Sequence, residues 1–461
     1  MRVKRASGKG VEPSARPRLL LGHHVAVEFR IGFRVAPQRI PIRIVDSRNL
    51  EFRPVTRGRL ALDLICKDAH TLSRRSLFST AALLGTGLTT LGSAPARATV
   101  PASALDEVVP TKAAPIALNF NENSLGMSAS AKKAVFDSLD KAFRYPDDAK
   151  EAARSATAAL HGVSPELVTL GSGSSQVIQA VVAAQVQKAR AAGKKVQLLQ
   201  PVPTFGVAES YAVALNVPVT NVPLNAETLE IDVEALKKAA ADFDGVTIVY
   251  FCNPNNPTGI VTDKAKLSGW IEASAAAKAP VFFLVDEAYG EYVENPAFES
   301  GVVLVKKGLD NLIVTRTFSK LYALAGLRLG YGIATKSVLT ECDLFESVDN
   351  INLAGAVAAA ATLEDKTYLE TSLAATKLSK AIVTKAFDEL GIKYLPSEAN
   401  FIFHRVKGDS DTYRKHMADA NILVGRAFPP FTGWNRLTLG TPGEMKAFVK
   451  VLKDFRAKGL I

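Results

Sequence analysis

Residues 315–320, Thr-Arg-Thr-Phe-Ser-Lys, follow an apolar run and place one lysine among several hydroxyl groups. A lysine beside the end of a buried strand is partly desolvated, which lowers its pKa and frees its amine to form an imine with a carbonyl compound. Thr317, Ser319 and the nearby Arg328 are typical partners of a phosphate group. By itself, however, this motif fits a solvated surface lysine as well as a reactive Lys320.

Asp286 and Tyr289 belong to the sequence Asp-Glu-Ala-Tyr, directly after the apolar run 281–285. A carboxylate at that point is costly to bury unless it faces a cation. A protonated pyridine ring would be such a cation, because an ion pair at ~4 Å and an effective dielectric constant near 20 gains roughly 4 kcal/mol. A metal-binding or helix-capping aspartate fits the motif alone equally well.

A rigid loop is predicted at residues 253–259, Asn-Pro-Asn-Asn-Pro-Thr-Gly, after another apolar run. Its two prolines and its glycine restrict the backbone, so that asparagine amides such as that of Asn256 project from a fixed turn. These amides could donate hydrogen bonds to a ligand oxygen. A plain turn would fit the composition, but not the position after a buried strand.

Residues 171–176, Gly-Ser-Gly-Ser-Ser-Gln, precede a predicted helix at 174–192. Glycines let the backbone approach an anion, and the start of a helix offers free N–H groups to it. The spacing of a dinucleotide-binding loop fails at Gln176, and the chain has no phosphate-binding loop of the GxxxxGK[ST] type. The motif therefore indicates an anion site, weakly when it is taken alone.

Short apolar runs predict the strands that must position these motifs, at 196–200, 217–222, 246–252, 281–286, 312–315 and 328–333. A helix is also expected at 128–143, capped by Ser128. Apolar strands that alternate with helices indicate an α/β fold with a mostly parallel, doubly wound sheet. Ligands of such sheets bind beyond the carboxyl ends of the strands, where the motifs fall. A smaller α+β pattern follows from about residue 350.

Taken together and in this order, the four motifs resemble those of fold-type I pyridoxal-phosphate (PLP) enzymes of the class I/II aminotransferase group, and within it the histidinol-phosphate aminotransferases. The resemblance covers about residues 115–445. It implies a large PLP-binding domain, a small α+β domain and a homodimer with shared active sites. It also implies transfer of an amino group between an amino acid, or an amine like histidinol phosphate, and a 2-oxo acid.

The resemblance further implies a role for each site residue. Lys320 forms the Schiff base with PLP and moves the proton, and Asp286 pairs with the ring nitrogen. Tyr289 and Asn256 bond the phenolic oxygen of the cofactor. The ring stacks on Phe205. The implied phosphate-binding residues are Gly173, Ser174, Ser175, Thr317, Arg328 and, from the neighbouring subunit, Tyr145.

The resemblance also implies that two arginines bind the substrate. Arg436 matches the arginine that holds the substrate carboxylate, and Arg426 matches a second anion-binding arginine. Leu125 stands where the family usually has a tyrosine that contacts substrate, and a missing hydroxyl can change specificity by large factors. An apolar or aromatic amino acid is therefore an alternative substrate.

Two other functions are compatible with parts of the pattern. A PLP-dependent decarboxylase acting on an amino acid or its phosphate would use the same scaffold and nearly the same motifs. A non-catalytic PLP-fold regulator would carry a helix-turn-helix in front, and residues 1–98 show none. No metal spacing occurs, and Cys252, Cys342, His161 and His404 are expected to be buried structural side chains, the histidines with satisfied hydrogen bonds.

The basic charge of the chain is confined to its first hundred residues. The net charge is +11 overall, but residues 1–70 carry about +9 and residues 71–98 about +3, so that the remainder is near neutral. Nucleic-acid binding is therefore not expected. No apolar run reaches the ~20 residues of a membrane span.

Residues 71–98 are organised like an export signal. Arg74 and Arg75 precede an apolar stretch at 77–91 and a small-residue end at 94–98, which resembles a twin-arginine signal and predicts a periplasmic protein, with a cytoplasmic one as the alternative. We expect residues 1–70 to be a disordered or mis-annotated leader, 99–150 an N-terminal arm with part of the small domain, 151–345 the large domain, and 346–461 the C-terminal small domain.

Overall fold

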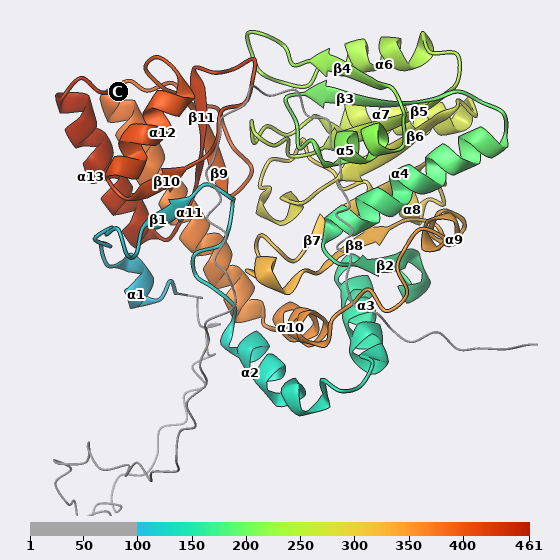
Figure 1. Cartoon of the computed structure of the whole chain (residues 1–461), viewed down its shortest axis with the longest axis horizontal. Helices are drawn as coiled ribbons and strands as arrows, with labels where there is room; N and C mark the ends of the chain where they lie inside the picture. The colour runs from blue at the N-terminus through green and yellow to red at the C-terminus, as the bar shows by residue number, and fades with distance from the viewer. Residues whose placement is uncertain (1–98) are drawn as a thin grey trace, which may run out of the picture. The chain divides into compact units, whose positions relative to one another are not determined.

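The computed structural model of the chain describes residues 99–461 (Figure 1). The leader and the export signal expected at 1–98 lie outside the described residues. None of the helices between residues 99 and 461 is long and apolar enough to cross a membrane.

A seven-stranded sheet forms the centre of the larger part (Figure 1). Its strand order is β2-β8-β7-β6-β5-β3-β4, in which neighbours from β7 to β4 are parallel, β8 runs antiparallel to β7, and β2 runs antiparallel to β8. This confirms the predicted mostly parallel sheet. The strands are β2 (Val168–Gly171), β3 (Val196–Val202), β4 (Val219–Pro223), β5 (Val246–Cys252), β6 (Val281–Asp286), β7 (Leu312–Thr317) and β8 (Gly330–Ile333).

Helices cover both faces of this sheet, as the doubly wound pattern requires. Consecutive residues of β6 show the division, because Phe283 packs into one core and Leu284 into the other. One face is covered by α4 (Ser174–Ala191), α5 (Val207–Ala214) and α9 (Lys336–Asp343). The other is covered by α6 (Val233–Ala241), α7 (Lys264–Ala276) and α8 (Val302–Lys306).

The smaller part is built from two short sheets packed on helices. β9 (Phe401–Arg405) pairs with β11 (Trp434–Thr438) antiparallel, and β1 (Ile116–Leu118) pairs with β10 (Ile422–Val424) parallel. The first strand of the described chain therefore joins the C-terminal region. The helices of this part are α11 (Lys366–Leu390), α12 (Ser410–Asp419), α13 (Pro442–Ala457) and the short α1 (Ala102–Leu105) beside α13.

A group of three helices lies at the bottom of Figure 1, where α10 (Leu353–Glu364) packs against α2 (Ala129–Ser138) and α3 (Asp147–His161). The prediction of one helix over 128–143 was wrong in length. Ser128 does cap α2, but the helix ends at Ser138, and Leu139 and Phe143 are exposed instead of continuing the buried face. Short 3-10 turns lie at Leu139–Lys141, Pro165–Leu167, Gly290–Tyr292 and Ala325–Leu327.

Candidate active site

A cavity of about 590 Å³ lies at the carboxyl ends of β5, β6 and β7, and β11 of the smaller part contributes to its wall. All four motifs reach it, as the position of ligand sites in such sheets predicts. The predicted site residues that line it are Lys320, Asp286, Tyr289, Ser174, Ser175, Phe205, Asn256, Thr317, Arg328, Arg436 and Arg426.

Asp286 is placed by the register of the sheet, which sets Cys252 of β5 and Thr315 of β7 on either side of it. Its carboxylate is 1% exposed and accepts hydrogen bonds from Tyr250 Oη at 2.8 Å and Thr315 Oγ1 at 3.3 Å. Burial raises its pKa to about 6. Such an acid gains most from an adjacent cation, so it fits a protonated ring nitrogen.

Lys320 follows β7 and is half-buried beside the N-terminal arm. Its Nζ donates to the Phe120 carbonyl at 3.0 Å. Burial, and then the positive charge of Arg436, lower the pKa of this amine to about 8. A lysine near its neutral form at moderate pH fits the covalent attachment of an aldehyde.

The opposite end of the cavity fits a phosphate group. Helix α4 begins after Gly173 without any side-chain cap, so its first N–H groups face outward at Ser174 and Ser175. Gly173 has φ 77°, and a Cβ there would overlap the Arg328 guanidinium, so that only glycine fits beside this arginine. Thr317 adds a hydroxyl, 2.9 Å from that of Ser319.

Tyr289, Asn256 and Arg436 form one hydrogen-bonded group between the two parts of the molecule. Asn256 Nδ2 donates to Tyr289 Oη at 3.3 Å, and Arg436 Nη1 donates to Asn256 Oδ1 at 2.6 Å. Burial lowers the pKa of Arg436 to about 10, and its Nε has no partner within residues 99–461. A buried arginine that retains an unused donor is well suited to a carboxylate.

Two further site residues were missed from the sequence. Asn121 Nδ2 donates to Tyr289 Oη at 3.0 Å, and Tyr250 bonds Asp286 as described above. The asparagine-rich stretch at 119–123 was a signal that could have identified Asn121. Tyr250 lies within an otherwise apolar strand and offered none, because its role depends on the register of β5 against β6.

Two predicted site residues, Tyr145 and Gly173, do not line the cavity. The Tyr145 side chain is 75% exposed. Gly173 makes room for Arg328. Cys252 and Cys342 are buried, as predicted.

The two histidines differ in whether their ring nitrogens are hydrogen-bonded. His161 is hydrogen-bonded, with Nε2 2.9 Å from Tyr331 Oη, which agrees with the prediction. His404 is not fully satisfied. Its Nδ1 lies 3.1 Å from the Arg405 carbonyl, whereas Nε2 has no partner in the described chain. The prediction was wrong for this nitrogen, because strand alternation turns the ring of His404 toward a second cavity.

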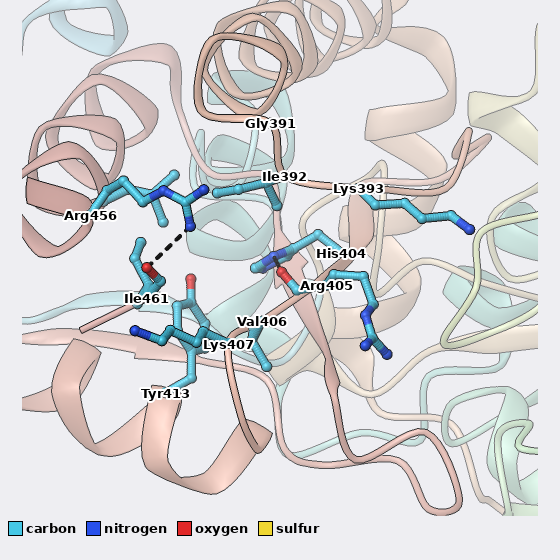
Figure 2. Close-up of a pocket in the computed structure, with 11 residues that line it drawn as sticks. Gly391, Ile392, Lys393, His404, Arg405, Val406, Lys407, Tyr413, Arg456 and Ile461 are labelled. Carbon is cyan, nitrogen blue, oxygen red and sulfur yellow. Dashed lines mark hydrogen bonds between the residues drawn. The ribbon is translucent and has the colours of Figure 1, made fainter. Parts of the chain in front are cut away.

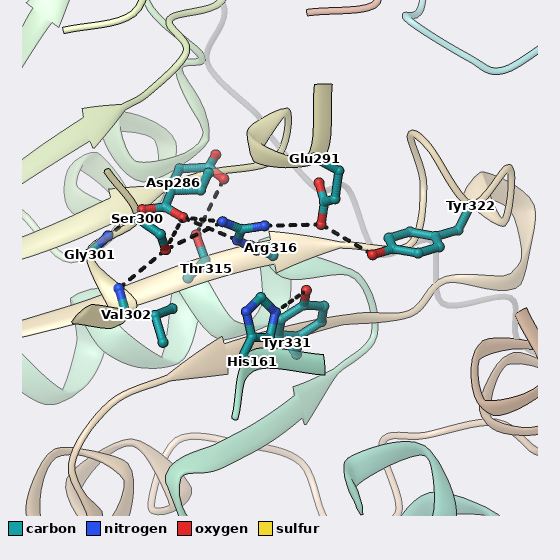
Figure 3. Close-up of polar contacts among 11 residues, drawn as sticks. His161, Asp286, Glu291, Ser300, Gly301, Val302, Thr315, Arg316, Tyr322 and Tyr331 are labelled. Carbon is teal, nitrogen blue, oxygen red and sulfur yellow. Dashed lines mark hydrogen bonds and ion pairs between the residues drawn. The ribbon is translucent and has the colours of Figure 1, made fainter. Parts of the chain in front are cut away.

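A buried ion cluster lies behind the site (Figure 3). Arg316 Nη2 contacts Glu287 Oε2 at 2.6 Å, and its Nη1 contacts Glu291 Oε1 at 3.3 Å. Glu287 also accepts from Ser300 and from the Gly301 N–H. Because Glu287 follows Asp286 and Arg316 follows Thr315, this cluster fixes the adjacent ends of β6 and β7.

Residues 114–452 match the family model of aminotransferase class I and II, and the chain belongs to this family. A histidinol-phosphate aminotransferase of Moorella thermoacetica is 32% identical over 344 residues, which cover 74% of this chain and 86% of that relative.

The crystal structures that are similar to this chain include two that differ in identity and coverage. One, provisionally named a histidinol-phosphate aminotransferase, from Erwinia carotovora atroseptica, has 38% identity and a TM-score of 0.73, covering 77% of this chain and 99% of its own. The other is a histidinol-phosphate aminotransferase of Sinorhizobium meliloti in complex with pyridoxal-5'-phosphate. It has 22% identity and a TM-score of 0.64, covers 74% of this chain and 91% of its own, and shows the shared fold.

The family and the cavity agree on the chemistry. The chain is a PLP-dependent aminotransferase, which acts on an amino donor and a 2-oxo acid. The buried acid, the amine of lowered pKa and the phosphate-binding helix start are the three features that this cofactor requires.

Proposed function

We propose that the amino donor carries more negative charge than one carboxylate, as the two carboxylates of an acidic amino acid or the phosphate of an amine like histidinol phosphate do. The supporting observation is the charge of the cavity, where Arg426 and Arg436 stand on the side formed by the smaller part and have no carboxylate partner within residues 99–461. Arg414 also lines the cavity but pairs with Asp411 at 2.8 Å. Arg328 serves the cofactor phosphate, so Arg426 and Arg436 are left for substrate. One carboxylate needs one bidentate arginine, and two arginines indicate a second carboxylate or a phosphate group.

We assign the following roles to the residues of the site. When bound, PLP supplies a covalent anchor for the amino group and a ring that withdraws electrons from the substrate Cα. Lys320 Nζ holds the cofactor and accepts the proton from Cα. Asp286 keeps a proton on the ring nitrogen by its negative charge. Arg436 orients the substrate carboxylate, and Phe205 covers the cofactor ring.

A screen of amino donors tests this assignment. Histidinol phosphate, L-aspartate and L-phenylalanine are each offered with 2-oxoglutarate, and the keto products are quantified. We expect the two anionic donors to turn over and Arg426→Gln to raise their KM about tenfold. Arg190→Gln, which changes an exposed arginine of α4 outside the cavity, is the matched control. Preference for L-phenylalanine, unchanged by Arg426→Gln, would refute the proposal that the donor carries more negative charge than one carboxylate.

The apolar lining supports a second candidate substrate. Phe120, Val424 and Phe428 line the same cavity. An aromatic amino acid would use this surface, and the same screen detects it. Omitting 2-oxoglutarate separates transamination from decarboxylation, because transamination stops without an acceptor, whereas decarboxylation continues and releases carbon dioxide.

We further propose that the chain acts as a homodimer with shared active sites. Several large apolar side chains of the segment 120–145 are exposed, among them Phe120, Phe136, Phe143 and Tyr145. Exposed large apolar side chains that are close in sequence favour burial against another protein. A second copy would cover it and would explain why Tyr145 does not reach the cavity of its own chain.

We propose export through the signal-like segment at 71–98. The paired Arg74 and Arg75, the apolar stretch and the small-residue end support this. Fractionation of cells that express the natural gene, with wild-type or Arg74→Lys/Arg75→Lys sequence, tests it. Periplasmic wild type and retained variant are expected, and equal cytoplasmic amounts of both would contradict export.

A further inference from the structure

Strand β11 brings two polar side chains to the face of the smaller part that meets the active site. Arg436 and Thr438 are two residues apart on this strand, so they lie on the same face of it. Thr438 pairs with Phe401 across the β9–β11 sheet, and Phe401 packs edge-on against Tyr289, with 5.0 Å between the ring centroids. The opposite face of the sheet carries His404, which lines a separate cavity (Figure 2). Thr438 therefore lies on the side of the active site.

The Thr438 hydroxyl is bonded twice to Asn121 of the N-terminal arm. Thr438 Oγ1 accepts from the Asn121 backbone N–H at 2.9 Å and donates to Asn121 Oδ1 at 3.1 Å. The reversed amide would leave the proton of a fully buried threonine without an acceptor, which is unfavourable. The Asn121 amide therefore presents Oδ1 to Thr438 and Nδ2 to Tyr289, 3.0 Å from Tyr289 Oη.

The other residue of the pair orients a second amide in the same way. Asn256 Oδ1 accepts from Arg436 Nη1 at 2.6 Å, and a guanidinium can only donate. Asn256 Nδ2 is therefore the atom that faces Tyr289 Oη, at 3.3 Å. Two donors thus meet at one hydroxyl, and each is oriented by a side chain of β11.

These two donors leave the Tyr289 proton for the cavity. Within residues 99–461, the hydrogen bonds of Tyr289 Oη are the two that it accepts from Asn121 and Asn256. Burial raises the pKa of Tyr289 above its ordinary value, so the hydroxyl keeps its proton at physiological pH. Because Tyr289 lines the active-site cavity, its O–H is a donor that faces the cofactor.

Asn121 is held rigidly in its place. It is 1% exposed, and its carbonyl accepts from Asn400 Nδ2 at 2.9 Å, so that its backbone and side-chain polar groups all have partners. Its φ of 55° lies in the left-handed region, which few residues other than glycine and asparagine adopt. Its hydrogen bonds and its backbone conformation together fix the direction of the amide.

We infer that Thr438 and Asn121 are positioning residues that act on the cofactor through Tyr289. They make the Tyr289 hydroxyl an acceptor toward the protein, so that its own proton is donated to the phenolic oxygen of bound PLP. Thr438 belongs to the smaller part and Tyr289 to the larger, so this chain of hydrogen bonds also couples the cofactor to the position of β11. The inference rests on attachment of PLP at Lys320 and does not depend on the amino donor.

A pH titration of the absorbance of the PLP-loaded protein tests the inference. Negative charge on the phenolic oxygen favours a proton on the attached nitrogen of Lys320, and a donor to that oxygen weakens this effect. Loss of the donor therefore raises the midpoint of the titration. We expect Thr438→Val and Asn121→Gly each to raise it by about 0.5–1 pH unit, and Tyr289→Phe to raise it most.

Two further variants separate positioning from a loss of stability. Thr438→Ser keeps the hydroxyl and should keep the midpoint of wild type. Thr362→Val is the matched control, since Thr362 is also fully buried and its hydroxyl donates to the Ala358 carbonyl at 2.8 Å, within α10. It should lower the melting temperature without moving the midpoint. Thr438→Val and Asn121→Gly break the same link from its two ends, so either variant that folds decides the question.

The direction of the change identifies the alternatives. A raised midpoint in Tyr289→Phe, with unchanged midpoints in Thr438→Val and Asn121→Gly, would overturn the inference and leave the contact of Tyr289 with the cofactor intact. A lowered midpoint in Asn121→Gly would also overturn it, because Tyr289 would then donate to Asn121 in the wild type. An unchanged midpoint in all three variants would exclude the contact of Tyr289 with the cofactor as well.

Discussion

Asp286 and Lys320 owe their unusual pKa values to the same cause. Burial raises the pKa of the acid to about 6 and lowers that of the amine to about 8, because it disfavours the charged form of each. Titratable groups with pKa values shifted in this way, when they line one cavity, are typical of catalytic sites. In this chain they are also the two groups that the cofactor needs.

Replacement of Asp286 by asparagine keeps its shape and removes its charge. The ring nitrogen would then lose its proton more readily, so we expect kcat to fall by about a hundredfold or more. Tyr250→Phe is the matched control, since it removes one donor to the carboxylate and leaves the charge. The measurement is kcat of both variants and of wild type. Similar kcat values for Asp286→Asn and wild type would exclude the role of Asp286 in keeping the ring nitrogen protonated.

The pH dependence of cofactor attachment reports on Lys320. The neutral amine is the reactive form, and its fraction increases as pH rises through the pKa. We expect the rate of PLP attachment to the apo-protein to increase up to about pH 8 and then level off. An increase that continues to pH 10 would mean that the amine is not desolvated.

At the scale of elements, the ion cluster of Arg316, Glu287 and Glu291 holds the ends of β6 and β7. Arg316→Met would leave two buried carboxylates without their cation, so we expect a loss of about 3–5 kcal/mol in the free energy of unfolding. Urea denaturation measures it. Glu272→Gln breaks the exposed pair with Lys307 and should have no measurable effect.

The strands whose bounds were predicted most accurately are those that are buried on both faces of the sheet. β5 and β6 are buried on both faces, so their apolar runs coincide with their observed bounds. β8 begins at Gly330 and not at the predicted 328, because Arg328 has φ 51°, which no strand accommodates. β2 was not predicted at all.

Site residues that belong to a sequence motif could be predicted, and residues that are placed by tertiary packing could not. Lys320, Asp286 and Asn256 stand in motifs with specific order and spacing. Tyr250 and the unpartnered nitrogen of His404 depend on strand register and on which face of a strand each side chain occupies. Neither can be read from one sequence without the paired strand.

At the scale of the whole molecule, the exposed apolar segment 120–145 predicts association of two copies. We expect Phe143→Lys to convert a dimer into a monomer in sedimentation experiments and to weaken PLP binding, because Tyr145 could no longer reach the neighbouring site. Val213→Lys changes another exposed apolar side chain, on α5, and should leave the dimer intact. A monomeric wild-type protein with full PLP affinity would contradict shared active sites.

Covalent attachment of PLP to Lys320 underlies every catalytic role proposed above. Sodium borohydride reduction of the PLP-loaded protein, followed by peptide mapping, locates the attachment directly, with Lys320→Ala as the control. We expect the pyridoxyl mass on the peptide that contains Lys320, and none in the variant. A pyridoxyl group on another lysine, or none on cofactor-saturated wild type, would contradict the assignment of this site.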